Sequence, residues 1–221
     1  MTPTYRTEEL SERTWPDFET LFSGGGGWDF CWCMAHQRGP RPSRQGFRTR
    51  AQVSVQNHQL KKKLFQQGQA HGILVYADDE PVGWCQYGSS DELTGFLNAA
   101  ELNLPGWWRI TCFVVHRKYR RQGLASLALR AALDAIRARG GGLVEAYPVA
   151  GWTHGKEASP GPTHIPGVGL VGRVWGQNRY TGTVSMFERE GFRAVGVCGS
   201  ASKRVRDEGA LGDHLVMHKL V

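Results

Sequence analysis

Residues 114–125, with the sequence VVHRKYRRQGLA, predict a turn from a strand into a helix. They begin as the end of an apolar run, 107–115, that is rich in residues favouring strands. They end inside segment 123–139, where leucine and alanine recur at helical spacing. The turn itself is basic, and its positive side chains are Arg117, Lys118, Arg120 and Arg121.

The beginning of such a helix is a binding site for anions. The first helical turn leaves backbone N–H groups unpaired, and the helix dipole adds partial positive charge. Gly123 lets an oxygen approach the main chain closely, and Ala125 keeps the adjoining helix face small. A pyrophosphate fits this arrangement. The turn is neither a Walker loop nor a dinucleotide-binding loop, because the glycine spacing of both patterns is missing.

Strand patterns flank this turn on both sides. Two apolar runs, 72–77 and 82–87, are joined by turn residues and predict a β-hairpin. A further strand, 143–149, follows the helix, and it predicts a parallel strand–helix–strand unit with 107–115. The expected fold is therefore of the mixed α/β class.

The first seventy residues predict a strand and two helices. The strand covers 5–10, and Ser11 is placed to cap a helix that stops at Gly24. The second helix covers 47–67, with Gly68 as its stop signal. Its core-facing side is expected to contain Val53, Leu60, Leu64 and Phe65. The lysines at 61–63 are interpreted as part of an exposed helix face.

Length and composition favour a single domain over residues 1–221. A chain of 221 residues with 40% hydrophobic side chains can bury one sizeable core. We expect an N-terminal strand and two helices in 1–70, the hairpin and central core in 72–149, and a long Gly- and Pro-rich loop in 150–180. A short helix at 181–190 and strands at 192–198 and 214–220 complete the part from 181 to 221.

Charge and cysteine content limit the function classes. The net charge of +7 favours an anionic partner such as a phosphorylated cofactor. The five cysteines are an odd number and lack the spacing of a zinc site, so neither a disulfide framework nor a bound metal is expected. There is no basic-then-apolar leader and no apolar run of membrane-spanning length, and a cytoplasmic protein without a membrane partner is expected.

The basic turn resembles the Arg/Gln-x-x-Gly-x-Gly/Ala signature of the GCN5-related N-acetyltransferase (GNAT) superfamily, with Arg120, Gly123 and Ala125 at the fixed positions. The strand before the turn, the upstream hairpin and the late segment 187–192, FEREGF, also resemble that family. The resemblance covers about 72–220. It implies a central mixed, largely antiparallel sheet, splayed at the cofactor site, with helices on both faces.

The resemblance also implies acetyl-CoA as the acetyl donor, with its pantetheine arm in the gap of the sheet. Main-chain contacts are then expected at Phe113, Val114 and Val115, and Phe187 occupies a family position near the cofactor. The pyrophosphate contacts implied by the resemblance are Arg120, Arg121, Gln122, Gly123, Leu124 and Ala125.

Acetyl transfer to an amine needs a base, a stabilised oxyanion and a proton for the leaving thiolate. A backbone N–H near Val114 or Val115 can serve the oxyanion. Glu145 and His116 are the candidate bases, and Glu145 has an ion pair with a nearby Arg as its alternative. The family's Tyr acid is replaced by Phe187, so Tyr147 and Tyr180 are the substitutes, each alternatively a packed aromatic residue.

The acceptor is expected to be the primary amine of a small molecule, beneath a cover formed by 150–180. Its pocket residues are expected to be Trp28, Trp32, Met34, Trp84, Gln86 and Trp107, and core packing is the alternative for segment 28–34. A protein N-terminus, a protein lysine and a non-catalytic acyl-CoA-binding role stay open, as does a homodimer. A nucleic-acid partner is not expected, because no basic face with interleaved aromatics is present.

Overall fold

The structure is a computed structural model that describes residues 3–24, 28–37, 49–93, 106–149, 163–165, 167–171, 180–198 and 214–221. Its centre is a seven-stranded mixed sheet in the order β1-β2-β3-β4-β5-β9-β8. The strands are β1 (Tyr5–Glu9), β2 (His71–Ala77), β3 (Glu80–Ser89), β4 (Trp107–Val115), β5 (Leu143–Ala146), β8 (Arg193–Cys198) and β9 (His214–Leu220). Only the β4–β5 pair among these neighbours is parallel, which confirms the expected mixed, largely antiparallel sheet.

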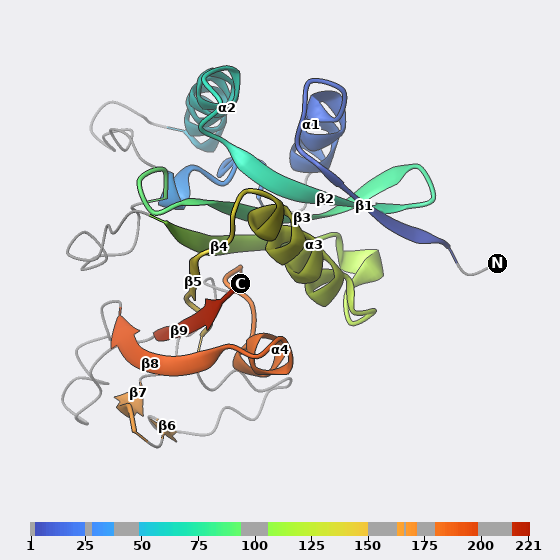
Figure 1. The fold of residues 1–221 in the computed structure, drawn as a ribbon. Coiled ribbons are helices and arrows are strands. Elements are labelled where there is room, and N and C mark those ends of the chain that lie inside the picture. Colours follow the sequence, from blue (N-terminus) through green and yellow to red (C-terminus); the bar gives the residue numbers. More distant parts are fainter. Residues whose placement is uncertain are drawn as a thin grey trace.

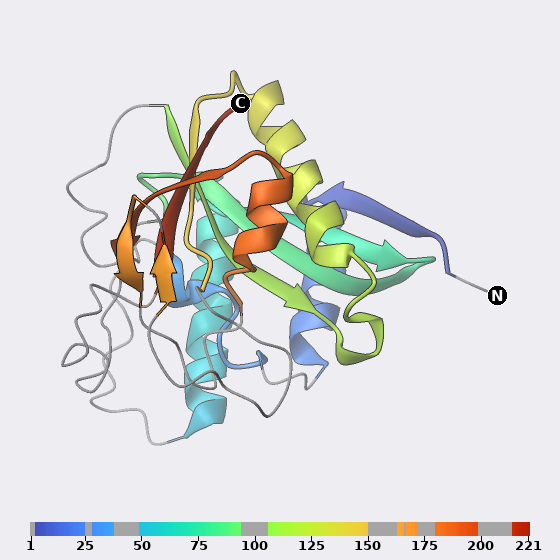
Figure 2. The same cartoon turned by 90° about the horizontal axis from the view of Figure 1, so that it is seen from below.

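Helices cover both faces of the sheet (Figure 1, Figure 2). One face carries α1 (Trp15–Ser23) and α2 (Arg50–Gln66), and the short helix η1 (Met34–His36) lies between them in sequence. The other face carries α3 (Leu124–Ala138) and α4 (Val184–Arg189), and η3 (Arg117–Tyr119) leads from β4 into α3. Each face has its own hydrophobic cluster, because alternate residues of the central strands point to opposite sides.

A β-bulge in β4 divides this strand into two parts. Gln86 of β3 pairs with Cys112, whereas the next residue, Tyr87, pairs with Ile110, so Thr111 is an extra residue. The Thr111 hydroxyl bonds Gln86, and Cys112 packs in the cluster under α1, so both extend toward the same face. The parallel pairing with β5 ends just before the bulge, at Ile110 and Ala146. Because a bulge bends the bulged strand, it accounts for the separation of β4 from β5 beyond this point.

Several sequence expectations need correction in the N-terminal half. The first helix begins at Trp15 with Thr14 at its N-cap position, not at Ser11. Ser11 instead exchanges hydrogen bonds with Thr14, which fixes the turn before the helix. The second helix begins at Arg50, after a capping box formed by Thr49 and Gln52. Residues 47–48 of the predicted helix lie outside the described part of the chain.

The buried side of α2 is polar, contrary to expectation. Its buried residues are Asn57 and Lys61, while the expected core residues Val53, Leu60, Leu64 and Phe65 are only partly buried. Lys61 therefore does not belong to an exposed face, although its neighbours Lys62 and Lys63 do.

The remaining elements agree closely with the predicted order. The strand after α3 is shorter than predicted and ends at Ala146, with Val149 in isolated bridges to Thr183 and His214. Within the predicted loop 150–180, the chain forms a small hairpin of β6 (Thr163–Ile165) and β7 (Gly169–Val171), so the expectation of a structureless loop is wrong there. The segments 150–162, 166 and 172–179 lie outside the described residues.

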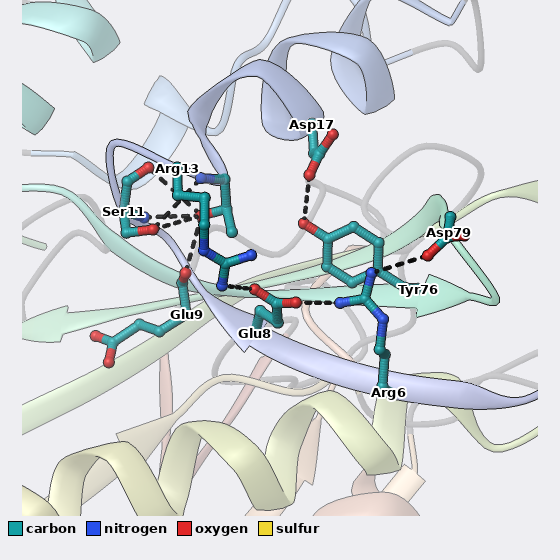
Figure 3. Close-up of polar contacts among 9 residues, drawn as sticks. Arg6, Glu8, Glu9, Ser11, Arg13, Asp17, Tyr76 and Asp79 are labelled. Carbon is teal, nitrogen blue, oxygen red and sulfur yellow. Dashed lines mark hydrogen bonds and ion pairs between the residues drawn. The ribbon is translucent and has the colours of Figure 1, made fainter.

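The N-terminal strand is fastened to its neighbours by polar contacts (Figure 3). Glu8 pairs with both Arg6 and Arg13, and Arg6 also lies over the ring of Tyr76 on β2. The Tyr76 hydroxyl donates to Asp17 of α1 at 2.7 Å. These contacts join β1, β2 and α1 at the edge of the sheet.

Candidate active site

The N-terminus of α3 is open to a ligand. Gly123 occupies the N-cap position with a φ of 81°, and no side chain caps the helix. A Cβ atom placed on Gly123 would meet no atom within 4 Å, so the glycine is needed here for its backbone conformation. The unpaired N–H groups of the first turn are therefore available to an anion.

The preceding loop is shaped by its own side chains. Arg120 donates from Nε to the carbonyl oxygen of Val115 at 3.2 Å. Gln122 accepts from the hydroxyl of Tyr5 and donates to the carbonyl oxygen of Lys118. Arg120, Arg121, Gln122 and Gly123 are all exposed, whereas Leu124 is buried and Ala125 partly buried. The loop thus presents two guanidinium groups beside the open helix end.

The end of β4 that leads into this loop has no strand partner on the β5 side. Phe113, Val114 and Val115 continue β4 beyond its last pair with β5. The Phe113 N–H donates to the carbonyl oxygen of Tyr180 at 2.5 Å, within the gap. An opened strand beside a basic helix end fits an elongated ligand with a diphosphate at one end, which is the shape of coenzyme A.

Glu145 is the centre of a buried polar cluster at the closed end of the gap. Its Oε1 accepts from Arg109 Nε at 3.2 Å and from the Tyr147 hydroxyl, and its Oε2 lies 2.9 Å from His218 Nε2. Burial alone would raise the pKa of the Glu145 carboxyl, but the hydrogen bonds from His218 and Tyr147 and the charge of Arg109 hold it below its usual value. The ion pair foreseen as the alternative to a base role is therefore present.

The other expected acid–base residues are not brought together. Tyr147 is buried beside Glu145, and burial raises the pKa of its hydroxyl, as does the charge of that carboxylate. Tyr180 is partly buried and packs against the cluster under α1, on the same face as Cys112. His116 lies beyond the end of β4, where its backbone N–H donates to the carbonyl oxygen of Val82. Arg109 of β4 lies opposite Glu145, and His116 is seven residues farther along the chain, or about 23 Å along a strand.

The expected pocket residues divide into buried and accessible ones. Trp28 and Trp32 belong to the cluster under α1, where their indole N–H groups donate to Leu21 and Ser54. Trp84 and Gln86 are fully buried, and Phe187 is buried on the opposite face between Phe113 and Phe192. Met34 and Trp107 retain partial exposure. Trp107 meets the His218 ring edge-on at 5.4 Å.

A polar network that the sequence did not reveal crosses the face under α2. Lys61 Nζ donates to Gln37 Oε1 at 2.9 Å, and Gln86 Nε2 donates to the same oxygen at 2.9 Å. Thr111 then donates to Gln86 Oε1, so the network ends at the bulge of β4. Burial lowers the pKa of Lys61, which has no carboxylate within ion-pair distance in the described chain. The only sequence signal was the absence of a strong apolar stripe on α2.

Two cysteines that are distant in sequence also meet beside the bulge. Cys33 Sγ donates to Cys112 Sγ at 3.0 Å, and both thiols are free. Among the described residues, no three His, Cys, Asp or Glu side chains are arranged to hold a metal ion. None of the described helices is long and apolar enough to cross a membrane.

Comparison with known proteins places this geometry in a family. The sequence profile described as "Acetyltransferase (GNAT) family" matches residues 28–151, more than half of the chain. A search of curated proteins gave no match.

Solved structures share the fold at low sequence identity. The ribosomal-protein-alanine N-acetyltransferase from Brucella melitensis superposes with a TM-score of 0.51 at 14% identity, over 98% of this chain and 99% of that one. An acetyltransferase of the GNAT family from Streptococcus pneumoniae gives a TM-score of 0.50 at 12% identity, over 99% of both chains. The chain therefore belongs to the acetyltransferase (GNAT) family, and it is an acyl-transferring enzyme that uses acetyl-CoA.

Proposed function

We propose that the protein transfers the acetyl group of acetyl-CoA directly to the primary amine of a small-molecule acceptor. The observation that carries the proposal is the cover over β4 on the face away from α3. Cys33 lies 3.0 Å from Cys112 there, and the buried Trp28 and Trp32 fill the space behind it. A narrow amine can reach the gap past such a cover more easily than a folded protein surface can.

The residues around the gap fit the donor. The N–H groups of the first turn of α3, together with Arg120, Arg121 and Gln122, would hold the diphosphate. The main chain of Phe113, Val114 and Val115 would bind the pantetheine arm, with Gly123, Leu124 and Ala125 forming the close approach at the helix end. When bound, acetyl-CoA supplies an acetyl group activated as a thioester.

Acid–base chemistry then falls to side chains at the closed end of the gap and beside it. The Glu145 cluster belongs to the base side of the reaction, because it holds the only buried carboxylate of the described chain. Tyr180 is the proposed acid. Its ring lies on the face of the sheet away from α3, where the acceptor would bind, and its carbonyl oxygen already contacts β4. Met34 and Trp107, which are partly exposed, are the proposed acceptor contacts.

A protein α-amine is the second acceptor class. The Brucella melitensis protein with this fold is named for acetylating the alanine of a ribosomal protein. An assay that measures thiol release from acetyl-CoA separates the two classes. Small amines such as spermidine and tyramine are compared with an alanine-initiated peptide and a lysine-containing peptide with a blocked N-terminus. We expect kcat/KM for at least one small amine to exceed that for both peptides, and the reverse order would assign a protein acceptor.

A further inference from the structure

A row of ionisable side chains crosses four adjacent strands at the closed end of the gap. In the sheet register, Arg109 of β4 lies opposite Glu145 of β5, Glu145 opposite His218 of β9, and His218 opposite Arg193 of β8. Side chains at directly opposed positions extend to the same face of a sheet. The residues between them, such as Val144 and Met217, pack in the cluster under α3, so the row faces away from α3.

The exposure of the row rises from β4 toward β8. The side chains of Arg109 and Glu145 are 1% and 2% exposed, whereas that of His218 is 20% exposed. Arg109 is held further by the carbonyl oxygens of Ser90 and Leu93, at 2.9 and 2.7 Å. Arg109 and Glu145 thus form a rigid support, whereas His218 and the exposed Arg193 can be reached by solvent and a small acceptor, and of these two His218 is the one that contacts Glu145.

The contacts of Glu145 determine which ring nitrogen of His218 carries the proton. With its pKa held below the usual range, Glu145 is a carboxylate and can only accept hydrogen bonds. His218 Nε2, at 2.9 Å from Oε2, must therefore be the protonated nitrogen. A neutral His218 then carries its free lone pair on Nδ1, for which the described chain provides no hydrogen-bond partner.

We propose that His218 is the general base that takes the proton from the acceptor amine, and that Glu145 is a positioning residue that acts through it. The proposal rests on the proposed acetyl transfer. Both oxygens of Glu145 are already occupied by donors, so the carboxylate itself is poorly placed to accept a proton. Ala146, the residue after Glu145, forms the last pair before β4 and β5 separate. His218 lies on β9, the next strand after β5, so it is one strand spacing, about 5 Å, from the β5 side of the gap.

The step is a simple proton transfer. The amine N–H bond breaks as the nitrogen attacks the acetyl carbon, and the proton moves to His218 Nδ1, forming an imidazolium held by the Glu145 carboxylate. The C–S bond of the thioester then breaks, and Tyr180, the proposed acid, would give the departing thiolate its proton. The same arrangement of carboxylate, imidazole and nucleophile operates in the catalytic triads of hydrolases. Proton transfer from a positioned side chain contributes about 10²- to 10⁴-fold to a rate.

The test compares His218→Gln and His218→Ala with wild type, using the amine from the panel above that is acetylated fastest. Gln keeps an N–H donor for Glu145 but cannot accept a proton at the position of Nδ1, so we expect kcat to fall about 100-fold or more with KM for acetyl-CoA unchanged. His218→Ala should regain at least about tenfold of its lost activity when imidazole is added. A fall below threefold in His218→Gln, or a His218→Ala variant that imidazole does not rescue, would overturn the proposal.

His71 provides a matched control. It lies in the same sheet, its side chain is 23% exposed, and its Nε2 meets Glu92 at 3.2 Å. His71→Gln should leave turnover unchanged. Nitrogen-15 NMR of the ring is independent of turnover: Nε2 must carry the proton in wild type, and a proton on Nδ1 would overturn the inference alone. Failure of wild type to acetylate any amine or peptide would overturn the proposed function as well.

Discussion

The Phe113 N–H donates to the carbonyl oxygen of Tyr180 at 2.5 Å, across the gap where β4 has no strand partner. This N–H is one of the main-chain groups expected to bind acetyl-CoA. Donor binding and the Tyr180 contact therefore compete for the same hydrogen.

We predict that acetyl-CoA releases the Tyr180 carbonyl. In an NMR titration, the Phe113 amide resonance should move until the donor saturates, and amide exchange at 180–183 should accelerate because the carbonyl loses its partner. The Leu10 amide, bonded to Gly72 at 2.9 Å, is the internal reference and should not move. A Phe113 resonance unchanged at saturation would show that the donor binds elsewhere on β4.

Replacing Gly123 with valine should abolish binding of acetyl-CoA. The branched side chain disfavours the φ of 81° and intrudes where a diphosphate oxygen must approach. Isothermal titration should show affinity weakened by about 100-fold or more, since loss of a charge-assisted hydrogen bond costs roughly 1.5–3 kcal/mol. Gly68→Val is the control, because Gly68 has a φ of 70° and equally open surroundings at the end of α2. Equal affinities in the two variants would refute the assignment of the diphosphate site to the N-terminus of α3.

Tyr180→Phe should lower kcat about 100-fold, the contribution of a general acid, with little change in donor affinity. Tyr147→Phe is the comparator, because the Tyr147 hydroxyl is held by Glu145 and its raised pKa reflects burial. Steady-state kinetics of both variants decide between them. A larger loss in Tyr147→Phe would transfer the acid role to Tyr147.

Glu145→Gln should destabilise the fold by about 3–5 kcal/mol at neutral pH, because it leaves the buried charge of Arg109 uncompensated. The effect should depend on pH with a definite sign. The pKa of the Glu145 carboxyl is lowered in the folded state, so the unfolded state binds its proton first as pH falls. The difference in free energy of unfolding should hold above the ordinary carboxyl pKa, about 4.3, and shrink below it. Urea titrations at several pH values measure this difference, and a constant value down to pH 3 would contradict it.

Lys61→Met should keep or increase stability at neutral pH. Burial lowers the pKa of Lys61, so the unfolded chain holds this proton at pH values where the folded chain releases it. The stability of wild type should therefore rise toward pH 10, and that of Lys61→Met should not. Gln37 Oε1 keeps its bond from Gln86 in the variant. Lys62→Met, at an exposed neighbour, is the control for urea unfolding.

The order of strands and helices was predictable because it depends on local patterns. Gly123 and the run 107–115 mark the strand, loop and helix with signals only a few residues long. The buried lysine of α2 was not predictable, since its partner Gln37 is 24 residues away and the helix has little apolar stripe.

The loop and helix end proposed for the donor could be located from the sequence, whereas the contact of His218 with Glu145 could not. Arg120 and Gly123 are neighbours in sequence, and one motif locates them together. His218 is 73 residues from Glu145 and meets it only through the register of β5 with β9. Cys33 and Cys112 are 79 residues apart, and their contact likewise depends on packing that no local pattern encodes.

Thr111, the extra residue in β4, shifts by one residue the alternation of side chains between the two faces of the sheet. Before Thr111, even-numbered residues such as Ile110 point toward α3, and after it odd-numbered ones such as Phe113 do. A regular strand of the same sequence would turn Phe113 and Val115 away from α3 and Cys112 toward it, whereas deleting Thr111 would remove the bulge and leave all three on their present sides. The bulge thus decides which side chains of this sequence face the reaction and which face the core.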